Sequence, residues 1–519
     1  MNKLLYILAI TVLAISSNSC TDDFLDRQPI DFMSPSSITT EADIVNALNG
    51  TYNALILEKK QPWAIDFMVD VGYCNDPSFG EVTFWNGAQT PVGTGYQLSK
   101  WNRNYQGILR ANTVLNKLDE IIMPDANRER YRGEALVLRA YFYGDLIEFY
   151  GDVPLRLKPE SLNDKVSPRV DREQIFNMVI SDLDSAAKRL PVTYPTSANG
   201  KITKGAALAL KARLCLYNKD YAKVIEACRE VMGLGVYSLH PSYAGLFLPA
   251  NENNKEFIMT QQYIPNKSDL GLSGEFWTNL YAYAAYQVPY NMIDAFYMKD
   301  GKPSSASILF DPKHPYNNRD PRLDFVVLCP FRKDGYGVVF DPTKTVIAAG
   351  AKVRKFIDYT NTTKVHRIDG GDFPLIRYAD VLLMLAEALV ESGTYDYDEV
   401  TGLVDMIRQR GDVKMPKVAS AEGAGGKILS TEELRQVIRH ERLVEFPFEG
   451  LRWSDVKRWD IGAEAFTDAK KVKVTKTATD TTYTIGVLAT RSFNTQKGYL
   501  WPIPELEIMT NPMPNNPGY

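Results

Sequence analysis

Residues 374–388 read PLIRYADVLLMLAEA, and this stretch sets the architecture that we predict for the chain. We expect a helix over 378–392, in which the small residues Ala386 and Ala388 interrupt a run rich in leucine. A second helix is expected over 398–410, joined to the first through Gly393, because Gly is favoured where a helix ends. The stretch therefore predicts a pair of packed helices.

A second pair of helices is expected earlier in the chain, over residues 203–217 and 221–232. Ala206, Ala207, Ala209 and Ala212 would let these two helices approach closely. Both pairs resemble a tetratricopeptide unit, but the period of about 34 residues is not repeated cleanly. We therefore expect divergent helical hairpins that serve mainly as a structural scaffold.

The rest of the chain divides into helical ends and an irregular middle. Amphipathic spacing predicts helices over 40–57, 101–122, 128–150 and 171–190, the last with Asp171 as its N-cap. Between residues 233 and 372, Pro, Gly, Asn and Asp recur around short apolar runs at 257–259, 325–328 and 338–340, which favour short strands and long loops. Thr-rich alternation over 463–491 favours an edge hairpin.

These patterns predict a mainly α protein in which residues 20–519 form one domain. We expect a scaffold of tetratricopeptide-like helical hairpins, mainly residues 40–232 and 373–460. The other half is expected to be loop-rich with short strands, mainly residues 60–100 and 233–372. Ordered loops on a rigid scaffold are where binding residues usually lie, so we expect the ligand in this half.

The composition excludes several functional classes. The chain has 59 Lys and Arg against 63 Asp and Glu, a net charge of −4, which gives no electrostatic case for binding nucleic acid. Five Cys in 519 residues do not make a disulfide scaffold. Cys215 and Cys228 are expected to be free core thiols, because a hairpin at a rise of about 1.5 Å per residue would offset them too far for a disulfide.

The familiar signatures of catalysis are missing from the sequence. Four scattered His disfavour a His-based metal or catalytic site. The sequence lacks a metalloprotease helix motif, a nucleophile elbow and a phosphate-binding loop. Carboxylates are plentiful, so a glycosidase pair is not excluded by counting, although nothing marks two of them as partners. We expect a protein without catalytic residues, metal or cofactor.

The first 19 residues read as a signal peptide. Lys3 precedes an apolar run over 4–15 that is too short to span a membrane, and small polar residues follow it. Cys20 stands where a bacterial lipoprotein carries its lipidated cysteine, although Ser17 replaces the aliphatic residue that is usual three positions earlier. We expect lipidation at Cys20 and anchoring in a membrane. The alternative is an ordinary signal peptide with a nearby Cys.

Aromatic residues in the irregular sequence are the candidate ligand contacts. Sugar rings present C–H faces that stack on aromatic rings, while their hydroxyls bond to Asn and Asp. One candidate group is an aromatic run, and the other is a looser cluster amid Gly, Pro and Asp. The candidates are Trp277, Tyr281, Tyr283 and Tyr286 in the run, and Trp85 with Asn75 and Asp76 in the cluster. The alternative is that these rings belong to the core, since Tyr and Trp often bury the ring and satisfy the polar tip.

Seven motifs in chain order resemble one family, the SusD/RagB-like outer-membrane nutrient-binding lipoproteins of Bacteroidetes. They are DFLD at 23–26, WNRNYQGILRAN at 101–112, RGEALVLRAYFYGDLIEFYGDVP at 132–154, DPRL at 320–323, the opening stretch at 374–388, ERLVEFPFEGLRWSDVKRW at 441–459, and the tail at 501–519. The resemblance covers essentially the whole mature chain. Arg377 and Arg452 within these motifs are expected to hold carboxylates or carbonyls inside the helical core.

The resemblance also implies a function. It implies a surface-exposed lipoprotein of the outer membrane that captures an oligosaccharide and delivers it to a SusC-like TonB-dependent transporter, over which it acts as a lid. Trp85 is the preferred stacking ring because members of the family often place one just before the helix that holds Trp101. The alternatives are a lid for non-glycan nutrients such as peptides, and a surface glycoside hydrolase.

Overall fold

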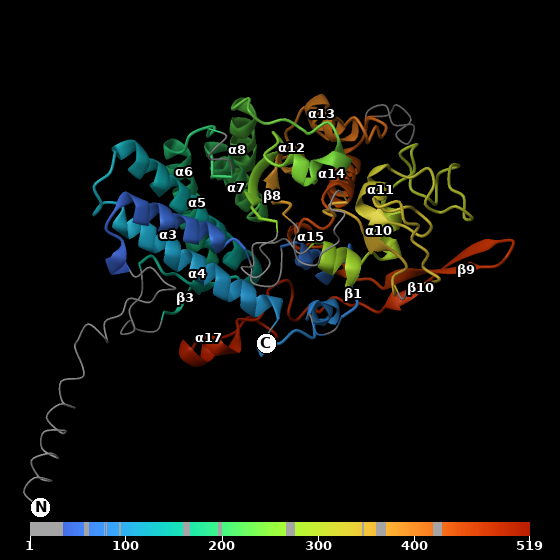
Figure 1. Cartoon of the computed structure of the whole chain (residues 1–519), viewed down its shortest axis with the longest axis horizontal. Helices are drawn as coiled ribbons and strands as arrows, with labels where there is room; N and C mark the ends of the chain where they lie inside the picture. The colour runs from blue at the N-terminus through green and yellow to red at the C-terminus, as the bar shows by residue number, and fades with distance from the viewer. Residues whose placement is uncertain are drawn as a thin grey trace, which may run out of the picture.

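The computed structural model describes residues 35–56, 62–76, 78, 80–92, 95–158, 167–195, 200–265, 276–344, 347–359, 370–418 and 428–519. The expected signal peptide and Cys20 lie outside these residues. Figure 1 shows helices gathered on one side of the molecule and short strands with long loops on the other. The prediction of a mainly helical protein with an irregular half is confirmed.

The helical part begins with three long helices. They are α3 (Glu41–Asn53), α4 (Tyr96–Lys117) and α5 (Asp125–Tyr150). Thr40 caps α3 with a full capping box in which Asp43 bonds back to the cap. Gly107 lets α4 lie against α5, because a Cβ at this position would come 2.3 Å from the ring of Phe142. These helices form one face of the scaffold.

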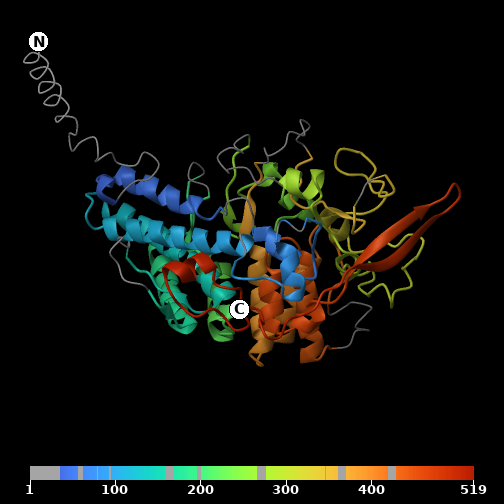
Figure 2. The same cartoon turned by 90° about the horizontal axis from the view of Figure 1, so that it is seen from below.

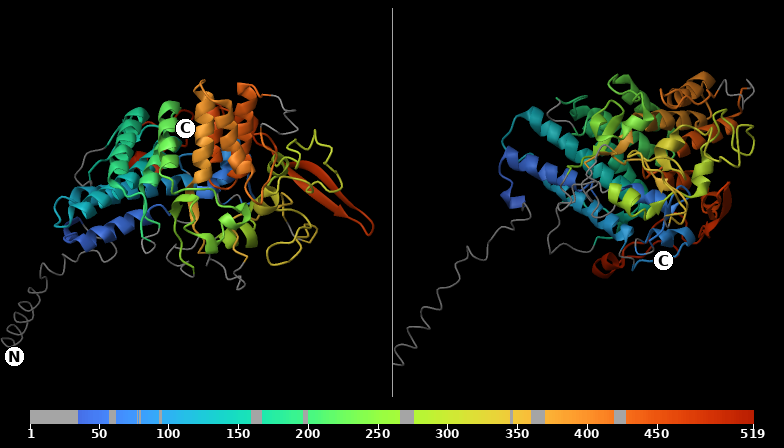
Figure 3. Two further views of the ribbon diagram at one scale, coloured as in Figure 1. Left: turned by 90° about the horizontal axis from the view of Figure 1, so that it is seen from above. Right: turned by 45° about the vertical axis from the view of Figure 1, so that its right-hand side comes forward.

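The two predicted helical pairs stand side by side, as the upright green and orange helices of Figure 3 show. The first pair is α7 (Lys204–Tyr217) with α8 (Tyr221–Gly233), and the second is α12 (Tyr378–Glu391) with α13 (Tyr397–Arg408). Helix α12 contacts α8, α7 and also α14 (Thr431–Glu445), which explains why nearly all its residues are buried. The preceding helix, α6 (Arg172–Arg189), begins after the predicted N-cap Asp171.

The irregular half is held together by short strands. β1 (Tyr73–Cys74), β5 (Tyr286–Gln287), β7 (Lys352–Val353) and β6 (Val327–Leu328) form an antiparallel sheet in that order. β4 (Phe257–Gln261) pairs with β8 (Phe373–Arg377), the strand that leads into α12. The strand expected over 325–328 starts later, because residues Arg322–Val326 form the short helix α11. Residues 338–340 contribute a single isolated bridge, Lys333 with Val339.

The remaining described elements are short, apart from one protruding hairpin. β2 (Val153–Pro154) pairs with β3 (Arg169–Val170), and the short helices are α9 (Tyr243–Leu246), α10 (Tyr290–Ala295), α16 (Gly462–Ala465) and α17 (Glu505–Thr510). The predicted hairpin is β9 (Ala469–Lys476) with β10 (Thr481–Ala489), which projects from the body in Figure 2. Helix α15 (Arg452–Trp459) precedes it.

The core is one continuous cluster of buried apolar side chains that runs through both halves. Cys74, Cys215, Cys228 and Cys329 are free and buried, so the prediction for Cys215 and Cys228 is confirmed. Among the described helices, none combines the length and apolar character that crossing a membrane would need.

Candidate functional site

The pairing of β1 with β5 brings the two aromatic segments of the sequence together. Tyr73 lies opposite Gln287, Cys74 lies opposite Tyr286, and the Asn75 N–H donates to the carbonyl of Ala285 at 2.7 Å. Residues about 210 apart in the chain thus share one edge of the irregular half. Neither aromatic segment, taken alone, predicts that it lies beside the other.

Three tyrosines form a cluster beside this edge. The ring centroids of Tyr281 and Tyr336 are 6.0 Å apart, those of Tyr281 and Tyr359 are 6.0 Å apart, and those of Tyr336 and Tyr359 are 5.0 Å apart. All three rings are partly exposed. We call Tyr281, Tyr336 and Tyr359 the tyrosine cluster. Partly exposed rings set at steep angles to one another offer aromatic faces in more than one direction.

Asp334 fixes the geometry of the tyrosine cluster. Its buried carboxylate accepts hydrogen bonds from the Tyr281 hydroxyl and from the backbone N–H groups of Tyr336 and Val338, the latter two at 2.9 and 2.8 Å. Burial and the bond to Asp334 raise the pKa of Tyr281 above its usual range, so this hydroxyl stays protonated. Lys352 places its ammonium 5.1 Å from the centre of the Tyr281 ring, which adds a cation to the same surface.

Two predicted stacking rings are corrected by the structure. Trp85 is 7% exposed and Tyr286 is 3% exposed, so neither ring offers a free face to a ligand. The Trp85 Nε1–H donates to the carbonyl of Phe67 at 2.9 Å, and the Tyr286 hydroxyl donates to Glu81 Oε1 at 2.9 Å. Both residues follow the alternative stated above: the ring is in the core and the polar tip is satisfied.

The other candidates are placed at or near the surface, and their role in binding stays a prediction. Tyr283 is 64% exposed, and Asn75 is exposed beside the β1–β5 edge. Asp76 is partly exposed and accepts bonds from the N–H and hydroxyl of Ser78 at 2.9 and 2.6 Å. Trp277 begins the helical turn Trp277–Ala282, but its side chain lies outside the described part.

Sequence reasoning missed Tyr336, Tyr359 and Asp334. The D-G-Y-G run at 334–337 could have indicated Asp334 and Tyr336, because Asp and two Gly are typical of a turn, and this turn presents an aromatic residue. Gly335 is required there, because a Cβ would come 2.1 Å from Cγ of Tyr359. Tyr359 carried no signal, since only the tertiary fold brings it to the turn.

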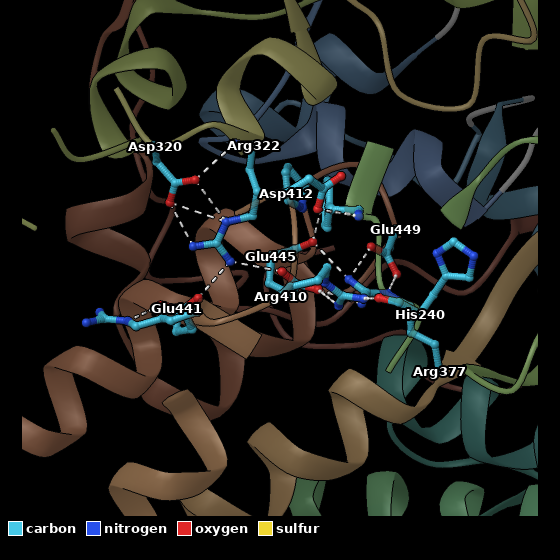
Figure 4. A network of polar contacts seen from close by, with 12 residues as sticks. His240, Asp320, Arg322, Arg377, Arg410, Asp412, Glu441, Glu445 and Glu449 are labelled. Atoms are coloured by element: carbon cyan, nitrogen blue, oxygen red, sulfur yellow. Dashed lines mark hydrogen bonds and ion pairs between the residues drawn. The ribbon is translucent and has the colours of Figure 1, made fainter. Parts of the chain in front are cut away.

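A second polar feature, the buried network of Figure 4, is structural. Arg377 bonds to Glu256, Glu445 and Glu449 at 2.7–2.8 Å, and Arg410 bonds to Glu256 and Glu445. Arg322 joins Asp320 and Glu441 to the same Glu445. The network links DPRL, β8, the turn after α13, and α14, and the expectation that Arg377 holds carboxylates in the core is confirmed. Arg452 also holds a carboxylate, that of Asp70 at 2.7 Å, but this partner is partly exposed and lies in the irregular segment after Met68 rather than in the helical core.

The network holds the carboxylate of Glu445 ionised. Burial alone would raise the pKa of Glu445, but Arg377, Arg410 and Arg322 lower it to about 2. Asp380 behaves in the same way, since Arg213 and Arg442 outweigh its burial and lower its pKa to about 2. A carboxylate held this way by arginines neither takes nor gives a proton near neutral pH.

Burial raises the pKa of several described carboxyl groups, and for Asp66 and Asp372 the value reaches about 7. Burial raises the pKa of Asp66 to about 7, where it accepts bonds from the backbone N–H groups of Gly450 and Arg452 and so joins two loops. Burial and neighbouring Glu252 raise the pKa of Asp372 to about 7. Asp372 with Glu252 is therefore the carboxyl pair on which a hydrolase hypothesis would rest. Among the described residues, no group of three or more His, Cys, Asp or Glu is placed to hold a metal ion.

Comparison with known families defines the class of protein. The family model described as "SusD family" matches residues 247–519, and the model described as "Starch-binding associating with outer membrane" matches residues 23–216. The chain belongs to the SusD family. The resemblance inferred from the seven motifs is therefore confirmed.

Individual relatives agree with this assignment. SusD-like protein P38 of Formosa agariphila is 27% identical over 86% of this chain and 89% of its own length. The crystal structure of a SusD-like protein from Bacteroides fragilis aligns with a TM-score of 0.82 at 26% identity, over 95% of this chain and all of that one. A laminarin-binding SusD-like protein has the same fold, with a TM-score of 0.67 at 22% identity over 93% of this chain and all of that one.

Proposed function

We propose that the protein binds carbohydrate on the loop surface formed by the tyrosine cluster, Tyr283, Asn75 and Asp76. The observation that carries the proposal is the tyrosine cluster itself, with partly exposed rings held by Asp334 next to a lysine. Aromatic faces beside amide, carboxylate and ammonium groups match the C–H faces and hydroxyl rim of a sugar. The carbohydrate-binding relatives and the starch-binding family description support the same class of ligand.

Family membership and the N-terminal sequence support the cellular role that we propose. In this proposal the protein is anchored through Cys20 to the outer membrane and faces the cell surface. It delivers oligosaccharide to a SusC-like TonB-dependent transporter and acts as its lid, without breaking a bond. Replacing Cys20 with Ser tests the anchor: the variant is expected in the soluble fraction and the parent protein in the membrane fraction. Equal membrane association of both proteins would reject lipidation at Cys20.

Binding to a panel of glycans and peptides tests the ligand class. A Tyr281→Ala, Tyr336→Ala double variant is expected to lose affinity for the bound glycan by about tenfold or more, since each ring contributes about 0.5–1.5 kcal/mol. Tyr395→Ala is the matched control, because Tyr395 is also partly exposed but bonds to Thr431 on the helical scaffold. Binding of peptides in place of glycans would contradict the proposal, as would unchanged glycan affinity in the double variant.

The same preparation separates binding from hydrolysis. Incubation with the bound glycan is expected to leave it intact. If cleavage is seen and Asp372→Asn abolishes it while binding persists, the hydrolase alternative is correct.

A further inference from the structure

A cavity of about 220 Å³ lies at the start of α7 and shares no residue with the tyrosine cluster. Its described walls come from α3, from residues 192–194 and 200–203, from 236–237, from 253–255 and from β4. The floor is apolar, with Leu55, Ile258 and Met259. At about 30 Å³ for each water, the volume equals roughly seven waters, which is enough room for one sugar ring with its substituents.

Tyrosine hydroxyls held in fixed positions line this cavity. The Tyr52 hydroxyl donates to Glu134 Oε2 at 2.7 Å and accepts from the Ile202 N–H at 2.9 Å. Tyr194 donates to the other oxygen of Glu134 at 3.3 Å, and the hydroxyls of Tyr237 and Thr203 bond to each other at 2.9 Å. These bonds orient the rings as well as the hydroxyls, so the cavity offers both aromatic faces and polar atoms.

The position of Tyr237 depends on a glycine in α7. A Cβ at Gly205 would come 2.2 Å from the Tyr237 hydroxyl oxygen, so only glycine leaves this ring its place against the helix. Gly in a helix is less favourable than Ala, because it loses more backbone freedom on folding. Gly205 is thus a less favourable helix residue at a position where a side chain would displace Tyr237 from the cavity wall.

Two lysines give the cavity an excess of positive charge. The Lys201 ammonium lies 3.7 Å from Glu134, whose carboxylate is fully buried, so these two charges offset each other. Lys255 is exposed at the opening, and in the described part of the chain its ammonium has no ion pair. Among the described residues, Lys255 therefore remains without a counter-ion at the opening, which favours a ligand with one negative charge.

We propose that this cavity binds a single acidic sugar ring of the hexuronate type, through Lys255 and the hydroxyls of Tyr237 and Thr203. The volume accommodates one ring, the aromatic and hydroxyl lining suits a sugar, and Lys255, which has no ion pair in the described part of the chain, favours a carboxylate. The inference takes only the ligand class, carbohydrate, from the proposed function. The cavity would recognise a charged residue of a glycan separately from the loop surface.

Calorimetric titration of the purified protein with glucuronate, glucose, acetate and inorganic phosphate tests this inference. Glucuronate is expected to bind about tenfold or more tightly than glucose, acetate or phosphate. Lys255→Met is expected to lower glucuronate affinity by about tenfold. The fold should not change, because this side chain is exposed. Tyr237→Phe, which keeps the ring, is expected to weaken binding severalfold, and Lys313→Met serves as an exposed lysine control.

Each contrary result overturns the inference. These results are undetectable glucuronate binding, equal binding of glucose, equal binding of acetate or phosphate, and unchanged affinity in Lys255→Met. Binding at the loop surface is measured separately from binding in the cavity. The Tyr281→Ala, Tyr336→Ala variant should keep its glucuronate affinity. Lys255→Met should keep its affinity for a neutral oligosaccharide. Failure of the cavity and failure of the proposed function therefore give different results.

Discussion

The indole ring of Trp85 stacks on the ring of Tyr73, with centroids 5.0 Å apart and 24° between the planes. The Arg491 guanidinium lies 4.7 Å from the centre of the same indole, and its N–H groups donate to the carbonyls of Val69 and Gly72. Trp85 is thus a packing residue that joins the short 3-10 helix Glu81–Asn86, before α4, to Arg491 beyond the β9–β10 hairpin. Its neighbour Tyr73, which is partly exposed, lies nearer the surface.

Trp85→Ala is therefore expected to destabilise the fold by about 3–5 kcal/mol, the usual cost of removing a large buried ring. Trp85→Phe keeps a ring but loses the bond to the Phe67 carbonyl, which should cost less. Urea denaturation measures both. Unchanged stability together with lost glycan binding in Trp85→Ala would return this residue to the binding site.

Glu445→Gln is expected to cost about 3–5 kcal/mol, because it leaves Arg377, Arg410 and Arg322 with an uncompensated buried charge. Glu399→Gln breaks the exposed pair with Arg229, which is 2.9 Å long, and should cost less than about 1 kcal/mol. The two free energies of unfolding are compared at neutral pH. Equal effects would show that burial does not decide the strength of these pairs.

Acid is expected to destabilise the protein through the buried carboxylates Glu445 and Asp380. The pKa values of Glu445 and Asp380 are about 2 in the fold, below the ordinary 4.5 and 3.8 of Glu and Asp. The fold thus favours the ionised forms, so their stabilisation is complete above those ordinary values and is lost as the pH falls toward 2. Denaturation midpoints at pH 6, 4 and 3 should fall in that order. In Glu445→Gln the fall below pH 4 should be smaller, and a fall as steep as in the parent protein would contradict this role of Glu445.

Gly335→Ala is expected to displace Tyr359 and to weaken glycan binding severalfold, because the new methyl group would come 2.1 Å from the tyrosine ring. Gly402→Ala in α13 is the control, since its Cβ would meet nothing within 4 Å. Binding calorimetry with the glycan identified by the panel measures the affinity of both variants and of the parent protein. Full affinity in Gly335→Ala would exclude Tyr359 from the binding surface.

The four described thiols are expected to stay unreactive in the folded protein. All are buried, and burial raises the pKa of Cys215 to about 12. A thiol reagent added to the Cys20→Ser variant should therefore detect four thiols only after denaturation. Rapid reaction in the native state would mean that a cysteine is accessible.

Much of the scaffold could be predicted because its signals are local. Asp171 is the N-cap that was predicted for its helix, Thr40, the first residue of the predicted helix 40–57, caps α3, and the alanines of α7 are buried. Only the ends moved: α4 begins at Tyr96 rather than Trp101, and α3 ends at Asn53. Helix ends depend on neighbouring loops, so periodicity places them less well than it places helix centres.

The binding surface was predicted only in part, for a physical reason. Tyr283 and Trp85 look alike in the sequence, as aromatic residues among loop-forming neighbours, yet one is 64% exposed and the other 7%. Burial of a loop ring is decided by what packs over it, and for Trp85 this is Tyr73 together with Arg491, which is distant in the sequence.

The sequence by itself determined the family, the helical scaffold and the arginines that bind carboxylates in the core, since these depend on local periodicity and on motifs. Only the tertiary structure decided which tyrosines gather at the loop surface and that a cavity, separate from this surface, opens beside α7. Both follow from long-range contacts, such as Asp334 with Tyr281 and Tyr237 with Thr203, which join segments of irregular sequence. Such segments carry no periodic signal that could indicate their partners.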